Sequence, residues 1–137
     1  MAWTIASAWV NPPSFDGTNS RVHRAKVIIS GTSSDTTEMA DESLLDISTL
    51  TNVNGAICTN IAIESISWSM SGGLDAVRLE FDATTDQSLG TFADTNSAKY
   101  DPPIIKSAAG GTGDILATSL GAAAGAAFRF ELCFRVI

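Results

Sequence analysis

The only histidine of the sequence, His23, is the side chain best suited to act as a general base near neutral pH. A Ser-His-Asp triad can be drawn from His23 and nearby serines, but no nucleophile-elbow pattern supports it. His23 alternates with Val22 and Arg24 in a segment of strand character. We therefore expect a surface or half-buried residue with satisfied hydrogen bonds, and no catalysis through it.

Paired carboxylates could supply the acid and base of glycoside hydrolysis. Asp82 with Asp86, or Glu80 with Glu131, could be proposed, and nothing in the sequence distinguishes these pairs. Asp82 and Asp86 border a short polar turn, where aspartate commonly accepts hydrogen bonds from the backbone of its own turn. A calcium ion is conceivable there, but the spacing does not follow the EF-hand loop. We predict a structural role for both aspartates.

The glycines of GGTGD, residues 110–114, lack the following lysine and helix of a phosphate-binding loop, so they predict a tight loop ahead of a strand. Cys58 and Cys133 are far apart and match no metal-binding spacing. Two reduced, partly buried thiols are expected, with a disulfide as the alternative. The sequence thus predicts no catalytic residue, cofactor or metal, and a protein that is not an enzyme.

The elements that would carry these residues are strands. At residues 128–136, five apolar side chains alternate with Arg129, Glu131, Cys133 and Arg135, which predicts a half-buried strand. Burying each apolar side chain contributes roughly 1.5–3 kcal/mol, so the apolar row must face a core, or a core that a partner completes. The apolar row is Phe128, Phe130, Leu132, Phe134 and Val136.

The segment ISWSMSGGLDAVRLEF, residues 66–81, predicts a hairpin that turns at Gly72 and Gly73. This pairing sets Trp68 opposite Val77 and Ile66 opposite Leu79. Further back the alternation slips, because Ile61 and Ile63 lie on the other parity. A bulge at Glu64 or Ser65 would add one residue and bring Ile63 opposite Phe81.

Other strands are expected at residues 2–10, 22–30, 87–93 and 114–120, with a less certain element at 44–50 that could be one or two helical turns capped by Asp41. NPPSFDG, SGTSSD, DPP and AAGGTGD separate them as breakers, and GAAAGAA at 121–127 predicts a connection between strands. The fold class is therefore all-β, an antiparallel β-sandwich or jelly-roll of about seven to eight strands with little helix. Residues 1–137 form one such domain, in which residues 1–20 could instead extend as an interacting arm.

The composition disfavours several partners. Eight basic and fifteen acidic residues give a net charge of −7, so most of the surface would repel a nucleic-acid backbone. The basic residues Arg21, Arg24 and Lys26 predict a solvated strand face. The opening MAWTIASAWV is short and has no basic leader, so we expect neither a signal peptide nor a membrane span, and synthesis in a cytoplasm.

What remains is a surface for a partner. Large rigid side chains near the termini and in loops could reach a partner or could plug the ends of the sandwich. The candidate partner-binding residues are Trp3, Trp9, Pro12, Pro13, Tyr100, Pro102 and Pro103.

The segment IAIESISWSMSGGLDAVRLEFDATTD, a later DP, and GGTGDILATSLGAAAGAAFRFELCFRV resemble the head decoration, or cement, proteins of tailed bacteriophages. The likeness covers residues 44–136 through the order of its parts. The amino-terminal 40 residues do not enter it, and the segment before the DP is SAKYDPP where the family has a glycine-rich one.

This resemblance implies a non-enzymatic β-rich virion protein, made in the host cytoplasm, that binds the major capsid protein on the exterior of the head. It also implies a homo-trimer at three-fold or quasi-three-fold positions. A tail or neck component of the virion and a carbohydrate-binding β-sandwich module, in which tryptophan and tyrosine stack on sugars, are the alternatives.

Overall fold

Nine strands and a short 3-10 helix make up the regular structure of the described residues. The structure, a computed structural model, describes residues 3–11, 23–50 and 55–137. The strands are β1 Trp3–Asn11, β2 His23–Ser33, β3 Glu42–Leu45, β4 Ile61–Ser71, β5 Ala76–Phe81, β6 Gln87–Phe92, β7 Thr95–Ile105, β8 Ile115–Leu120 and β9 Ala127–Val136. The all-β fold class is confirmed, with one strand more than the upper end of the expected range.

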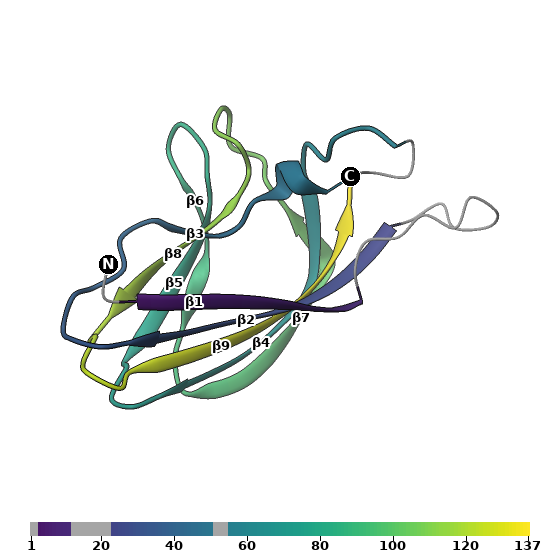
Figure 1. The fold of residues 1–137 in the computed structure, drawn as a ribbon. Helices are drawn as coiled ribbons and strands as arrows, with labels where there is room; N and C mark the ends of the chain where they lie inside the picture. The colour runs from purple at the N-terminus through teal and green to yellow at the C-terminus, as the bar shows by residue number, and fades with distance from the viewer. Residues whose placement is uncertain (1–2, 12–22, 51–54) are drawn as a thin grey trace.

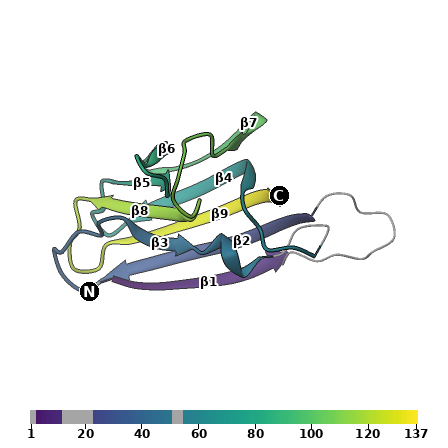
Figure 2. The ribbon, with the colours of Figure 1, turned by 90° about the horizontal axis from the view of Figure 1, so that it is seen from above.

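The strands form two packed sheets, a five-stranded sheet in the order β1-β2-β9-β4-β7 and a four-stranded sheet in the order β3-β8-β5-β6 (Figures 1 and 2). Their pairs are nested, because β2 pairs with β9, β3 with β8, β4 with β7 and β5 with β6. A long hairpin wound around itself gives this order, which is the jelly-roll form of the sandwich. β1 is an additional strand at the edge beside β2.

The core lies between the sheets, where the predicted apolar rows meet. The β9 row from Phe128 to Val136 is at most 5% exposed, and Val77, Leu79 and Phe81 of β5 are fully buried. Aromatic side chains join the layers, since the Phe92 ring of β6 lies edge-on to Phe130 of β9 at a centroid distance of 5.7 Å. These rows confirm the inward faces predicted for residues 77–81 and 128–136.

The predicted hairpin at Gly72 and Gly73 is wrong. The two glycines turn the chain from β4 in one sheet to β5 in the other, so the strands on either side do not pair. Trp68 instead lies opposite Phe130, because β9 offers the inward aromatic row that β4 needs. A turn within one sheet and a turn between sheets look alike in sequence.

The predicted bulge is confirmed at Glu64, where the register of β4 shifts between Ile63 and Ser65. Its effect differs from the prediction, since it sets Ile63 opposite Phe134 of β9. The extra residue lets the inward row change parity and stay on the core side.

The DPP segment also differs from the prediction, because Asp101, Pro102 and Pro103 lie inside β7. The ladder to β4 is interrupted there, since Lys99 pairs with Ser65 and Ile104 with Ile63. An edge strand tolerates proline where no ladder hydrogen bond is required.

Residues 42–49 give both a strand and a helical turn. β3 ends at Leu45, and the 3-10 helix Ile47–Thr49 follows. Its cap is Asp46, which accepts a hydrogen bond from the Ser48 N–H at 2.9 Å, so the expected Asp41 cap is wrong.

Residues 3–11 of the amino-terminal segment form a strand that pairs with β2, so this part of the segment is not an extended arm. Trp3 is only 4% exposed, and its ring lies 5.7 Å from that of Phe128. Its indole N–H donates to the Thr37 carbonyl at 2.9 Å. Of the two roles expected for Trp3, the structure shows the second, because its ring closes one end of the core.

Candidate docking surface

The outward face of the five-stranded sheet gathers cations from strands that lie far apart in the sequence. Strand alternation directs Arg129, Cys133 and Arg135 of β9 away from the core. The register places Lys26 of β2 and Ser65 of β4 on either side of Cys133, and Lys99 of β7 beyond Ser65. We call this surface the basic face; its charged residues are Arg24, Lys26, Glu64, Lys99, Asp101, Arg129, Glu131 and Arg135.

Short side chains surround these charges. One row across the sheet runs from Ala8 through Ile28 and Glu131 to Ser67 and Ser97. The next row runs from Ala6 to Thr95 and contains two serines and one arginine. In the described part of the chain, the outward positions of these rows hold no aromatic residue. A broad surface of short side chains is suited to contact with another protein surface.

Two glutamates hold the cations in place. Glu131 accepts from Lys26 Nζ at 2.7 Å and lies 3.6 Å from a terminal nitrogen of Arg129. Glu64 accepts from Arg24 Nε at 3.1 Å, and its other oxygen lies 3.9 Å from Arg135 Nε. Each glutamate thus bridges one cation of β2 and one cation of β9.

The hydrogen bond that Lys26 donates to Glu131 raises the pKa of Lys26 above its ordinary value, so the ammonium stays charged. Arg135 Nε is buried and has no hydrogen-bond partner among the described residues. The Arg24 side chain is 62% exposed and that of Arg129 is 52% exposed. These two guanidinium groups are therefore accessible to an acidic partner.

The basic face differs in sign from the rest of the molecule. Its five cations and three carboxylates carry a net charge of +2, while the whole chain carries −7, which leaves −9 for all other residues. The sequence alone does not reveal this separation, because Arg24 and Arg135 are adjacent only through the pairing of β2 with β9. This charge separation could have been predicted only by combining the alternation of each strand with knowledge of which strands pair.

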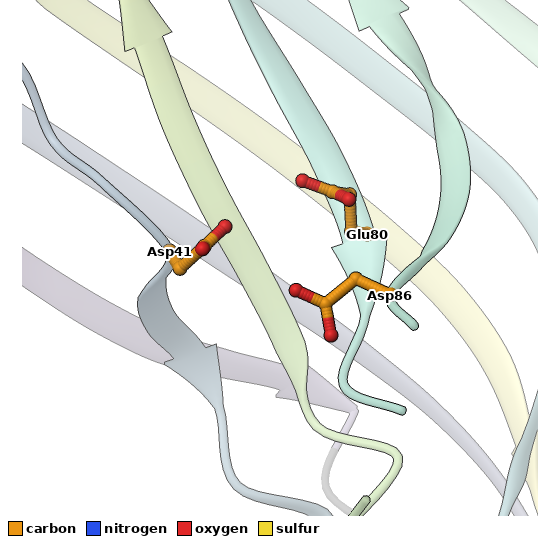
Figure 3. Close-up of side chains that lie close together, drawn as sticks. All are labelled: Asp41, Glu80 and Asp86. Carbon is orange, nitrogen blue, oxygen red and sulfur yellow. The ribbon is translucent and has the colours of Figure 1, made fainter. Parts of the chain in front are cut away.

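Three carboxylates gather near the four-stranded sheet (Figure 3). One oxygen each of Asp41, Glu80 and Asp86 lies within 4.8 Å of the others. They could together hold a cation, but protein groups already contact each one: Asp41 accepts from Thr118 Oγ1 at 3.3 Å, and Glu80 pairs with Arg78 at 2.9 Å. Sequence reasoning missed the cluster because its members come from three separate elements.

The carboxylate pairs considered as acid and base for hydrolysis are either hydrogen-bonded within loops or too far apart to act together. Asp86 accepts from the Ala83 N–H at 3.1 Å, as expected for a turn aspartate. Asp82 accepts from both the hydroxyl and the N–H of Thr112, at 2.7 and 2.8 Å. These bonds lower the pKa of Asp82, the hydroxyl bond most. Glu80 and Glu131 belong to different sheets and point outward from opposite sides of the sandwich, so they cannot act on one bond.

The other residues and loops considered from the sequence lie in separate parts of the fold. His23 begins β2, and the GGTGD loop precedes β8 with positive φ at all three of its glycines. GAAAGAA connects β8 to β9, as predicted. Cys58 is buried and Cys133 is half-buried, and both are free thiols, as expected. Burial raises the pKa of Cys58.

The candidate partner-binding residues do not form one site. Trp9 is 40% exposed on β1, whereas Tyr100 is half-buried on β7, at the opposite edge of the same sheet. Pro102 is exposed beside Tyr100, and Pro103 is half-buried. Pro12 and Pro13 lie outside the described residues. Binding through these groups stays a prediction.

No protein-family model matches the chain, and no curated protein matches it. Similar solved structures include a disulfide-linked pilus protein of Bacillus endospore appendages, with 15% identity and a TM-score of 0.40 over 93% of this chain and 97% of that one. A mutant of a family 29 carbohydrate-binding module has 10% identity and a TM-score of 0.41 over 96% and 86%. The N-terminal cellulose-binding domain of a Cellulomonas fimi glucanase has 9% identity and a TM-score of 0.32 over 99% and 89%. At these scores the likeness carries no argument about function.

No helix in the described ranges is long and apolar enough to cross a membrane.

Proposed function

We propose that this chain is a non-enzymatic docking protein that binds an acidic protein surface through its basic face. The observation that carries the proposal is the net charge of +2 on one broad sheet face of a chain whose net charge is −7. Such a charge separation orients the molecule toward an acidic partner and fixes which side makes contact. The short side chains of the face allow close approach over a wide area.

The particular role that we propose is decoration of a bacteriophage capsid. The support is the resemblance of residues 44–136 to head decoration proteins, together with the docking geometry of the basic face. A protein that binds several capsid subunits only in the assembled lattice stabilises the closed shell by linkage. Several copies joined together would strengthen modest individual contacts. The major capsid protein is the expected partner.

Heads that lack this chain test the role. Purified expanded heads are mixed with the protein and sedimented, and DNA release on heating is compared with and without it. We expect the protein to sediment with the heads and to raise the temperature of DNA release. Absence from heads at every stage of expansion, or attachment only to tails in electron microscopy of labelled particles, would reject capsid decoration.

A carbohydrate-binding module is the second candidate, because the exposed indole of Trp9 could stack on a sugar. Tyr100 cannot join Trp9 in one stacking surface, since the two residues lie on the opposite edge strands β1 and β7. A glycan array probed with the wild-type chain and with Trp9→Ala separates the candidates. Glycan binding that Trp9→Ala abolishes, with no binding to heads, would establish this second function and reject the first.

A further inference from the structure

The two sheets have four edge strands, and three of them are poor templates for pairing with another strand. β7 carries Lys99 and two prolines, β3 has only four residues, and β6 has six with a register shift in its ladder to β5. Charges, prolines, shortness and bulges are the devices by which proteins protect sheet edges. These three edges are therefore closed to regular strand addition.

The fourth edge, β1, is less protected: its ladder to β2 is regular from Trp3 to Trp9, and a register shift occurs only near its end, between Trp9 and Asn11. Its nine residues, WTIASAWVN, contain no charge and no proline, and β2 pairs with it on one side only. Figure 2 shows β1 at the outer border of the five-stranded sheet, with no other described strand beyond it. Residues 6–10 are exposed, and they include Trp9 at 40% and Val10 at 55%. A row of backbone N–H and C=O groups thus faces outward beside exposed apolar side chains.

We infer that β1 pairs antiparallel with β1 of a second copy of this chain. A two-fold axis through Ser7, the central residue of the strand, pairs residues 5–9 with one another, and all of these lie in the regular part of β1. In that register Trp9 lies opposite Ile5 of the second copy, on the core side of the sheet. Ala6 lies opposite Ala8 on the outward side. The two sheets then continue into one.

The distribution of charge supports self-pairing in this direction. No like charges meet along the seam, because β1 has none. Lys26 of β2 lies level with Asn11, near one end of the strand. In the two-fold pair its counterpart lies level with residue 3, eight residues away, or about 27 Å at 3.4 Å per residue. This exceeds the Debye length of about 8 Å at physiological ionic strength, so the cations do not oppose pairing.

The axis of such a pair stands perpendicular to the sheet, so both copies present the basic face on the same side. The pair would therefore offer two docking surfaces to one partner surface, which increases avidity without any new contact. The pairing of β1 does not depend on the proposed function, whereas this gain in avidity rests on it.

A charge-exchange experiment tests the register. In the double variant Ala6→Lys with Ala8→Lys, like charges oppose each other twice across the seam. In Ala6→Lys with Ala8→Glu, opposite charges meet twice. Mass is measured by light scattering on size-exclusion chromatography, and circular dichroism verifies the β fold. We expect twice the 14.3 kDa chain mass for the wild type and the Lys/Glu variant, and the single mass for the Lys/Lys variant.

Cross-linking gives an independent measurement in a Cys133→Ser background. Ser7→Cys places two thiols opposite each other at a distance that a disulfide can span. Thr4→Cys is the matched control, because its two copies lie six residues apart along the seam. A covalent dimer with Ser7→Cys and none with Thr4→Cys supports the pairing. A wild-type monomer, a trimer whose mass neither charge variant changes, or equal cross-linking of the two cysteine variants would overturn it.

Discussion

Arg24 of β2 donates its Nε–H to the Glu64 carboxylate of β4 at 3.1 Å, across the intervening strand β9. Glu64 is the extra residue of the β4 bulge, and its second oxygen faces Arg135 of β9 at 3.9 Å. One irregular position thus serves two purposes. It corrects the inward row of β4 and places a carboxylate among the cations of the basic face.

Reversing two charges on the basic face should abolish docking without unfolding the protein. Lys99→Glu with Arg129→Glu changes the net charge of this face from +2 to −2. We expect at least a tenfold loss of affinity for phage heads, and weaker wild-type binding as salt is added. Unfolding free energy should change by less than about 1 kcal/mol, because exposed ion pairs contribute little. Sedimentation and denaturant titration measure the two effects.

Arg78→Glu is the matched control, since Arg78 projects from the four-stranded sheet. Its effect on head binding should stay below twofold. Equal losses from the control and the double variant would show that docking does not use the basic face.

Modification of Cys133 should block docking. This thiol is half-buried at the centre of the basic face, between Lys26 and Ser65, whereas Cys58 is 3% exposed. A bulky maleimide at neutral pH should react with Cys133 first, because burial also raises the pKa of Cys58 and reduces its thiolate fraction. Mass spectrometry locates the label, and sedimentation with heads measures the loss. Full binding by the labelled protein would contradict the assignment, and Cys133→Ser provides the unlabelled control.

Alanine at Gly72 should destabilise the fold more than alanine at Gly73. Both glycines have positive φ, so each substitution incurs a penalty of about 1–2 kcal/mol. A Cβ at Gly72 would also lie 2.0 Å from the Gly125 carbonyl oxygen, whereas a Cβ at Gly73 meets open space. We expect about 1–3 kcal/mol more for Gly72→Ala, from the backbone shift that it forces. Equal denaturant midpoints would show that the two turns do not touch.

The Asp82 carboxylate should stabilise the protein at neutral pH but not in acid. Hydrogen bonds from the Thr112 hydroxyl and N–H lower its pKa in the folded state. The contribution is therefore present above the ordinary aspartate pKa of about 3.9 and is lost as pH falls through the lower folded value. Asp82→Asn should reduce stability at pH 7 and differ less from the wild type as the pH falls below about 4. Denaturant titrations at both pH values measure this, and a pH-independent difference would contradict it.

The sequence predicts the inward rows well because each depends on a single strand. The alternation at Val77–Phe81 and Phe128–Val136 defines both which residues are buried and which point outward. The parity change between Ile63 and Ile66 even locates the bulge. These features are local, so no knowledge of partners is required.

Pairing is less predictable, because it depends on strands far apart in the chain. Nothing near Trp68 indicates that its neighbour is Phe130 rather than Val77. β7 is hidden by Pro102 and Pro103, which only an edge position tolerates. The basic face combines both difficulties, because its charges become neighbours only after β2, β9, β4 and β7 have taken their order.

The nested pairing has a consequence for biosynthesis. Within its sheet β2 can pair only with β1 until the ribosome has produced Ala127–Val136, because β9 is its other neighbour and separates it from β4. Cotranslational folding of the five-stranded layer must therefore wait for this late segment, and until then the apolar sides of β2 and β4 depend on transient cover such as chaperones.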